Sequence, residues 1–271
     1  MAYWQTEDAL TSAFKQFASQ VGSERHLFWC RDDLRLLDLG LKGYSYGFSE
    51  EADLKIDNFQ QIGWKSVFDV TFLTRHYSEI EIPLIGAHNV LNAAAVFGMG
   101  IKLNLPANAI KNALLSFEGV GRRAEKKGSV SQIDVYDDYA HHPTEIFATL
   151  RALKTASGGR KVVVAFQPHR YSRTRDCIEE FPEAFDYADE LIITDIYAAR
   201  EAPLDGITAE ALLQKILKAR KTPASYIKRP DLTRYLIKFL KSGDVLVTMG
   251  AGDITYVGPE VLQELQKDEK K

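Results

Sequence analysis

The feature of the sequence that most constrains the fold is a set of short, uninterrupted apolar runs in its second half. Val162-Val163-Val164-Ala165-Phe166 is one such run, and Leu191-Ile192-Ile193 is another. A strand with one solvated face alternates apolar and polar residues, whereas a continuous apolar run predicts a strand that is buried on both faces. Because such strands are typical of parallel sheets covered by helices, we expect an α/β fold here.

Strand and helix patterns alternate from residue 130 onward. We predict strands at residues 133–137, 161–166, 190–196, 224–227 and 244–249, and helices at residues 144–155, 176–187, 208–219, 230–240 and 259–266. Repeated alternation of this kind favours a Rossmann-like, mainly parallel sheet with helices on both faces.

The first half of the chain has a different texture. We predict helices at residues 6–20, 90–100 and 106–117, strands at residues 27–30 and 44–48, and an antiparallel patch over residues 54–82 with turns at Gly63 and at residues 75–78. The predicted first helix has Thr6 as its N-cap. The Gly-rich, basic stretch that follows the last of these elements suggests two domains, residues 1–120 and 121–271.

Polar segments follow four of the predicted strands of the second half. They cover residues 137–145, 167–174, 197–201 and 250–253. Ligands of open parallel sheets bind beyond the carboxyl ends of the strands, so these segments predict a binding site on one rim of the sheet.

Arg170 and Arg173 are the residues of this rim best suited to an anion. They lie three positions apart, so one helical turn would place both guanidinium groups on the same side. Arginine offers planar, paired N–H donors that match a carboxylate or a phosphate. The alternative is that they are two solvated arginines at the start of a helix.

The segment Asp137-Asp138-Tyr139-Ala140-His141-His142-Pro143-Thr144-Glu145 contains two acids and two histidines. Adjacent histidines on a loop seldom chelate one ion, so we predict no metal ligands here. Asp138 could face a metal-bound nucleotide or orient a histidine, and Thr144 could cap the next helix. The alternative is that Asp137, Thr144 and Glu145 only cap this helix, and that one histidine is a core residue.

Two glycine-containing segments allow more than one interpretation. Gly119-Val120-Gly121-Arg122-Arg123-Ala124 matches G-x-G-x-x-A but does not follow a strand, so a hinge whose arginines grip phosphates is favoured over a dinucleotide site. Gly250-Ala251-Gly252 follows a predicted strand and is either an anion-binding helix start or a tight turn.

His88, Asn89 and Asn92 begin the Ala-rich helix predicted near residue 90. Asn89 and Asn92 share one face of its first turn, and an amide side chain can pair with an adenine edge because it carries both a donor and an acceptor. The alternative is an asparagine N-cap.

Composition limits the partners of the chain. The 34 Lys and Arg residues against 37 Asp and Glu residues give a net charge of −3, which favours neither nucleic acid nor an anionic membrane. No window reaches the roughly 18 apolar residues that a membrane span needs. Only Cys30 and Cys177 are present, without metal-type spacing, so we expect a cytoplasmic protein. The sequence does not distinguish a monomer from a homodimer.

Taken together, the segments resemble the Mur ligase family in order and spacing. They cover residues 88–93, 119–123, 137–145, 167–174, 195–201 and 249–254, and two of them, residues 167–174 and 195–201, resemble the branch that uses L-alanine in particular. The resemblance implies that residues 1–120 are the end of a P-loop-type ATP-binding domain and that residues 121–271 are the C-terminal domain. It also implies that ATP, with Mg²⁺, phosphorylates the carboxylate of UDP-N-acetylmuramate, and that L-alanine attacks the acyl phosphate.

The resemblance further implies roles for individual residues. The catalytic residues would be His142, Arg170 and Arg173, and the substrate-binding residues would be Tyr139, His142, His169, Arg170 and Arg173. The nucleotide would be bound by His88, Asn89, Asn92, Arg122 and Asp138.

The sequence departs from the family pattern in one respect. It contains no G-x-x-x-x-G-K-[ST] motif and no Gly-Lys dipeptide, so it lacks the loop that cradles ATP phosphates, and the Mg²⁺ ligands are expected mostly upstream. We therefore expect no ligase turnover from this chain alone. The alternatives are a ligase that joins a murein tripeptide to UDP-N-acetylmuramate and a non-catalytic module that binds nucleotide or amino acid.

Overall fold

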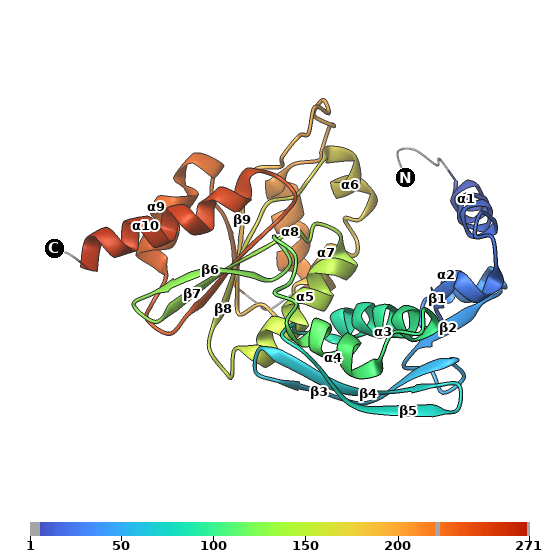
Figure 1. The fold of residues 1–271 in the computed structure, drawn as a ribbon. Coiled ribbons are helices and arrows are strands. Elements are labelled where there is room, and N and C mark those ends of the chain that lie inside the picture. The colour runs from blue at the N-terminus through green and yellow to red at the C-terminus, as the bar shows by residue number, and fades with distance from the viewer. Residues whose placement is uncertain (1–5, 220–222, 270–271) are drawn as a thin grey trace. The chain divides into compact units, whose positions relative to one another are not determined.

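The computed structural model describes residues 6–219 and 223–269. The chain divides into two compact units, one ending at Glu118 and the other beginning at Gly119. Each unit has its own sheet and its own apolar core (Figure 1).

The first unit is built on a mixed sheet in the order β1-β2-β3-β4-β5. Its elements are α1 (Glu7–Ser19), the 3-10 helix η1 (Glu24–His26), β1 (Phe28–Cys30), α2 (Leu34–Asp38), β2 (Tyr44–Gly47), β3 (Leu54–Ile62), β4 (Lys65–Phe72), β5 (Arg75–Ile82), α3 (Ala87–Lys102) and α4 (Ala107–Leu115). The pairs β1–β2 and β2–β3 are parallel, whereas β3–β4 and β4–β5 are antiparallel, which confirms the predicted antiparallel patch.

The core of the first unit lies on one face of this sheet. Every second residue of β4 is buried, including Phe68 and Val70, while the residues between them are partly exposed. The buried side of α3 packs on this apolar face through Phe97. The alternation that predicted these strands therefore marks a sheet with one covered face.

One prediction for the first unit is wrong. A turn was expected at residues 75–78, but β5 already begins at Arg75 and the turn lies at Leu73 and Thr74. Leu73 closes this hairpin with a φ of 55°. A leucine does not predict a turn, because the left-handed backbone conformation is normally adopted by glycine or asparagine.

The second unit is built on a sheet in the order β10-β9-β8-β11-β7-β6. Its elements are β6 (Glu125–Val130), β7 (Ile133–Asp138), α5 (Pro143–Ala156), β8 (Val162–Phe166), α6 (Tyr171–Asp176), α7 (Phe181–Ala184), β9 (Glu190–Ile193), α8 (Ala209–Ala219), β10 (Ala224–Tyr226), α9 (Arg229–Phe239), β11 (Val245–Met249), the 3-10 helix η2 (Asp253–Tyr256) and α10 (Val257–Glu269). All its pairings are parallel except β6–β7, so the predicted Rossmann-like sheet is confirmed.

Helices cover both faces of this second sheet. In Figure 1, α9 and α10 lie over one face, and α5, α7 and α8 lie over the other. Val163 and Ala165 of β8 belong to the core beneath α9 and α10, whereas Phe166 packs against Phe181 and Phe185 on the opposite side. Consecutive residues of a strand point to opposite faces, which explains why all of β8 is apolar and buried.

Three details of the second unit differ from the prediction. Strand β6 was missed, because Glu125-Lys126-Lys127-Gly128-Ser129-Val130 is polar and this edge strand pairs only with β7. Strand β9 ends at Ile193, three residues earlier than expected. The helix predicted at residues 176–187 is wrong, because α6 ends at Asp176 and only the four-residue α7 lies within that range, with Pro182, which lacks an N–H, in its first turn.

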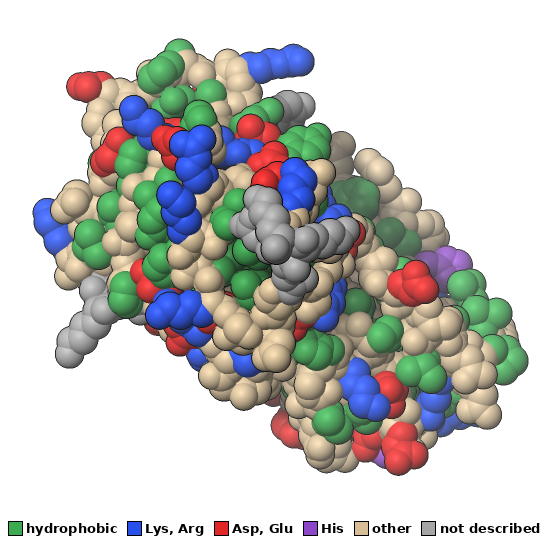
Figure 2. Space-filling view, turned by 90° about the vertical axis from the view of Figure 1, so that its left-hand side faces the viewer, with side chains coloured by type: hydrophobic (Ala, Val, Ile, Leu, Met, Phe, Trp, Pro, Cys, Tyr) green, Lys and Arg blue, Asp and Glu red, His purple; other side chains and the backbone are tan. Residues whose placement is uncertain are grey.

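In Figure 2, Lys and Arg side chains lie among Asp and Glu side chains on the face shown, in keeping with the net charge of −3. Within residues 6–219 and 223–269, no helix combines the length and the apolar character that crossing a bilayer would require.

Candidate functional site

The carboxyl ends of β7, β8, β9 and β11 meet at one edge of the second sheet. The parallel register places Asp138 of β7 and Phe166 of β8 on either side of Met249 in β11. The segments that follow these strands therefore lie near one another, and they contain most of the site residues predicted from the sequence.

Four aromatic rings form a continuous row across this edge. Tyr139 meets His141 edge-on at 5.3 Å between ring centroids, and His141 lies 5.7 Å from His169. His169 in turn stacks on Tyr197 at 5.6 Å with an interplanar angle of 9°. The row joins the segments that follow β7, β8 and β9, so it brings predicted residues together from separate parts of the chain.

Arg173 is bonded to His169, an inner member of this row. Its Nη1 lies 3.1 Å from Nδ1 of His169 and donates to the His169 carbonyl oxygen at 3.2 Å. Arginine can only donate, so Nδ1 must accept, and His169 is neutral with its proton on Nε2. Burial, together with the neighbouring Arg173 guanidinium, lowers the pKa of His169 to about 4. His169 is therefore a fixed, uncharged acceptor at neutral pH.

Arg170 has an unusual backbone conformation and a buried, unpartnered donor. It precedes α6 with φ 71° and ψ 139°, a region that residues other than glycine seldom adopt. Its Nε is buried and makes no hydrogen bond to any other residue in the described parts of the chain. A buried N–H without a partner costs about 1–3 kcal/mol, so this donor is suited to an acceptor that arrives with a ligand.

His142 has a different environment from the other predicted substrate residues. It is the N-cap of α5, where its Nδ1 accepts from the N–H of Thr144 at 3.4 Å, and its Nε2 lies 3.7 Å from Sγ of Cys177. The carboxylate of Glu145 accepts from the N–H groups of His141 and His142, which completes the cap. The prediction that Thr144 caps this helix is therefore wrong, because the N-cap is His142, two residues earlier.

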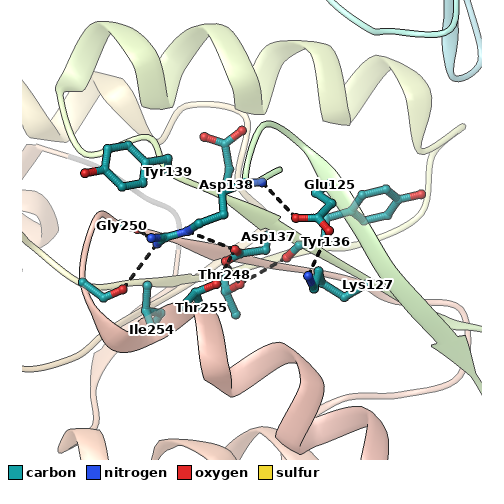
Figure 3. A network of polar contacts seen from close by, with 12 residues as sticks. Glu125, Lys127, Tyr136, Asp137, Asp138, Tyr139, Thr248, Gly250, Ile254 and Thr255 are labelled. Carbon is teal, nitrogen blue, oxygen red and sulfur yellow. Dashed lines mark hydrogen bonds and ion pairs between the residues drawn. The ribbon is translucent and has the colours of Figure 1, made fainter. Parts of the chain in front are cut away.

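Arg122 is tied to the end of the sheet by its side chain. Its Nε lies 3.3 Å from the carboxylate of Asp137, and its Nη2 donates to the carbonyl oxygens of Gly250 and Gly252. Asp137 is completely buried and also accepts from the hydroxyls of Thr248 and Thr255, at 2.7 and 2.6 Å (Figure 3). This network locks residue 122 onto β7 and onto the turn that follows β11.

Asp138 is also buried, and its carboxylate binds backbone. It accepts from the N–H groups of Ala124 and Ala140, both at 2.7 Å. Burial raises the pKa of Asp138 to about 6, although these two donors favour its ionised form. The geometry assigns it a positioning role for residues 122–124 and for the segment that carries Tyr139.

The segment Gly250-Ala251-Gly252 forms a tight turn. Gly250 has a φ of 144°, and a Cβ there would lie 2.6 Å from the carbonyl oxygen of Gln167. The 3-10 helix η2 follows and continues directly into α10, and the N–H of Ile254 in η2 already donates to Oε1 of Gln167 at 3.1 Å. Of the two interpretations left open by the sequence, the structure favours the turn.

His88, Asn89 and Asn92 lie in the first unit, at the start of α3. Gly86 is the N-cap, so the alternative of an asparagine N-cap is wrong. The amide of Asn89 donates to the carbonyl oxygen of Ile85 and lies 3.2 Å from Nε2 of His88, whereas Asn92 is exposed. Among the residues that the structure describes, no cluster of His, Cys, Asp or Glu is arranged to hold a metal ion.

Comparison with known proteins places the chain in a family. A family model for "Mur ligase middle domain" matches residues 1–100, and one for "Mur ligase, glutamate ligase domain" matches residues 122–252. The chain belongs to the Mur ligase family. The predicted membership is thereby confirmed.

Several Mur ligases are close relatives of the chain. The UDP-N-acetylmuramate–L-alanine ligase of Protochlamydia amoebophila is 41% identical over 99% of this chain and 59% of its own length. The bifunctional enzyme MurC/Ddl of Chlamydia pneumoniae is 39% identical over 93% of this chain and 31% of its own length. A crystal structure of a UDP-N-acetylmuramate-alanine ligase from Thermotoga maritima has a TM-score of 0.81 and 26% identity, and the match covers 98% of this chain and 56% of that one. The chain thus spans about three-fifths of the L-alanine ligase from Protochlamydia amoebophila.

Two members of the ring row were not among the residues predicted from the sequence. His141 donates from Nδ1 to the carbonyl oxygen of Tyr139 at 2.9 Å, which leaves its Nε2 as an acceptor, and burial lowers its pKa. Tyr197 lay in a segment that carried the Mur ligase resemblance, but nothing in the sequence alone distinguished its ring. The signal that could have found both is the position of each residue just beyond the end of a buried strand.

Proposed function

We propose that the chain is the later part of an ATP-dependent UDP-N-acetylmuramate–L-alanine ligase. The observations that carry the proposal are the ring row, whose His169 is bonded to Arg173, and the buried, unpartnered Nε of Arg170. Two guanidinium groups suit the carboxylate of a free amino acid, and the rings beside them favour a small side chain. The 41% identity to an L-alanine ligase over nearly the whole chain supports this choice.

The geometry of the second unit supports a proposed role for each residue. Arg170 and Arg173 hold the carboxylate of L-alanine, with His169 keeping Arg173 in place. Tyr139 lies at the end of the ring row opposite to Tyr197. His142 acts from the start of α5 on the acyl-phosphate side. In this assignment the arginines neutralise the charge of the L-alanine carboxylate and orient its amine for attack.

The nucleotide roles rest on fewer contacts. Asn89 and Asn92, with His88, are proposed to bind adenine, because the Asn92 amide is exposed and carries both a donor and an acceptor. Arg122 is proposed to serve the ATP phosphates, and Asp138 to hold its segment in place through Ala124. Mg²⁺ would be bound with the ATP phosphates, and no step is assigned to a metal ligand within this chain.

A chimera tests the proposed reaction. The matching segment of the Protochlamydia amoebophila relative is replaced by this chain, and phosphate release is measured with ATP, Mg²⁺ and UDP-N-acetylmuramate. We expect release to depend on L-alanine, and the chain alone to give none. A folded chimera that ignores L-alanine but responds to a murein tripeptide would replace the proposal with the alternative ligase.

Three arginines of one short helix region provide matched variants. We expect Arg170→Lys and Arg173→Lys to raise KM for L-alanine roughly tenfold or more, because lysine loses the paired, planar donors. Arg175→Lys is the control, since Arg175 is exposed and pairs with Asp176. Equal effects of all three variants would contradict the assigned roles.

A further inference from the structure

The backbone of Tyr197 is joined to both sides of His169. Its N–H donates to the carbonyl oxygen of Pro168 at 2.8 Å, and its own carbonyl oxygen accepts from the N–H of Arg170 at 2.9 Å. His169 and Tyr197 form an isolated parallel bridge. This bridge holds the strained backbone of Arg170, because it fixes the peptide units on both sides of His169.

The ring of Tyr197 lies between His169 and a glycine. It stacks on the imidazole of His169 with an interplanar angle of 9°. A Cβ on Gly252 would lie 2.6 Å from Cγ of Tyr197 and would also collide with Oε1 of Gln167. The Gln167 side chain is itself fixed, since it donates to Asp253 at 2.7 Å and accepts from the N–H of Ile254 at 3.1 Å. The turn that follows β11 therefore forms a firm support behind the Tyr197 ring.

The orientation of the His169 ring sets one of the two contacts that hold Arg173, since the other is the His169 carbonyl oxygen. Nδ1 of His169 is the side-chain acceptor of the Arg173 guanidinium. A turn of the imidazole out of its present plane, about the Cβ–Cγ bond, would carry Nδ1 away from the guanidinium. A stacked aromatic partner restricts this rotation, because offset stacking loses contact when one ring turns.

We propose that Tyr197 is a positioning residue that orients the His169 imidazole and, through it, the Arg173 guanidinium for the substrate carboxylate. This inference rests on the proposed function for the identity of the substrate. Its structural part concerns the chain alone, since the ring contacts and hydrogen bonds that carry it all lie within the second unit. Tyr197 itself need not touch the reacting atoms.

Nuclear magnetic resonance of the histidine rings tests the structural part without any substrate. In the parent chain, the ¹⁵N shifts of His169 should show a single neutral tautomer with its proton on Nε2, assigned with a His169→Gln variant. Tyr197→Ala should give mixed tautomers and raise the pKa of His169 toward its ordinary value, because the ring becomes exposed. Tyr197→Phe should restore the parent spectrum, since the stacked ring is kept.

Two further variants guard against simple loss of folding. Tyr235→Ala removes a comparable stacked ring, 5.5 Å from Phe239 on α9, and should leave the His169 signals unchanged. Gly252→Ala should disturb His169 as Tyr197→Ala does, because its Cβ displaces the Tyr197 ring. An unchanged His169 tautomer in folded Tyr197→Ala would overturn the inference.

Kinetics of the chimera test the link to the substrate. Tyr197→Ala should raise KM for L-alanine roughly tenfold, as expected for a misplaced binding group, with kcat and KM for ATP changed far less. Tyr197→Phe should remain within about twofold of the parent. A disturbed His169 with an unchanged KM for L-alanine would overturn the positioning role. A parent chimera without any L-alanine dependence would refute the proposed function, while the resonance experiment would still decide the orientation of His169.

Discussion

The two units of the chain bury their strands in different ways. In the second unit, β8 and β11 are buried along their whole length, and helices cover both faces of the sheet. In the first unit, β4 alternates between buried and partly exposed residues, and α1 contributes no buried residue at all. Phe17 of α1 is 69% exposed. A unit with one covered face buries less apolar surface per residue, so it should have the smaller free energy of unfolding.

The same difference in burial distinguishes the candidate amino-acid site from the candidate adenine site. The residues that hold the ring row come from the ends of buried parallel strands, which cannot shift without disturbing a close-packed core. The candidate adenine residues lie on the first two turns of one helix in the less buried unit. The account therefore predicts a rigid amino-acid site and a nucleotide site that depends on how well the first unit is held together.

The largest expected effect comes from matched core truncations in the two units. Phe97 and Phe166 are both fully buried, one in α3 and one in β8. Each change to alanine should cost about 3–5 kcal/mol. We expect Phe97→Ala to unfold the first unit and Phe166→Ala to leave the second unit folded, as followed by hydrogen exchange. If Phe166→Ala unfolded the second unit while Phe97→Ala left the first unit folded, the predicted difference in stability between the units would be wrong.

The pH dependence of the second unit gives the next largest effect. The pKa of Asp138 is raised by burial to about 6, above the ordinary value near 3.8, so its stabilising contribution is complete below about pH 4 and is lost as the pH rises through 6. The difference corresponds to about 3 kcal/mol. Asp138→Asn should lack this slope in urea unfolding of the second unit.

Titration of His169 changes the stability of the second unit in the opposite direction over the same pH range. Its pKa is lowered to about 4, so its contribution is present above the ordinary value near 6.5 and is lost as the pH falls toward 4. The contribution of each group to stability is therefore obtained from the difference in pH slope between the parent chain and a variant that lacks that group. Identical pH slopes for the parent and Asp138→Asn would contradict the assigned shift.

Removal of Arg122 should have a smaller effect, confined to the second unit. Arg122→Ala leaves the buried carboxylate of Asp137 with its two hydroxyl donors but without its cation. We expect a loss of about 2 kcal/mol, since a hydrogen bond to a charged group contributes about 1.5–3 kcal/mol. Arg123→Ala is the neighbouring control in the same urea unfolding experiment. A comparable loss in both variants would mean that the network around Asp137 is not the cause.

The smallest effect is expected on α1. Phe17→Ala should change the free energy of unfolding of the first unit by less than about 0.5 kcal/mol, because the side chain is exposed. Thermal unfolding followed by hydrogen exchange in β3 and β4 measures it. A loss as large as that of Phe97→Ala would show that α1 belongs to the core, and would remove the contrast between the units.

The sequence predicted most strands of the second unit because burial on both faces imposes a strong pattern. Val162-Val163-Val164-Ala165-Phe166 can hardly lie anywhere but in the middle of a covered sheet. Strand β6 escaped notice for the opposite reason, since an edge strand with one neighbour needs no apolar run. The split between α6 and α7 depends on a turn at residues 177–180, which helical propensity alone does not show.

The candidate site was predictable at the level of segments and less so at the level of single side chains. The carboxyl-edge rule located the segments that carry Tyr139, His169, Arg170 and Arg173. It could not separate His141 from His142, because neighbouring residues at a helix start point in different directions and only the fold decides which one meets His169. Tyr197 depends on a contact with Gly252, which is distant in sequence.

The central claim is that Arg170 and Arg173 hold the carboxylate of L-alanine, and the Nε–H resonance of Arg170 tests it most directly. This donor is buried and makes no hydrogen bond to other described residues. The account predicts that L-alanine shifts the resonance in a saturable way, and that L-alaninamide, which lacks the carboxylate, does not. An Arg170 Nε–H signal that ignores L-alanine, or that responds equally to the amide, would contradict it.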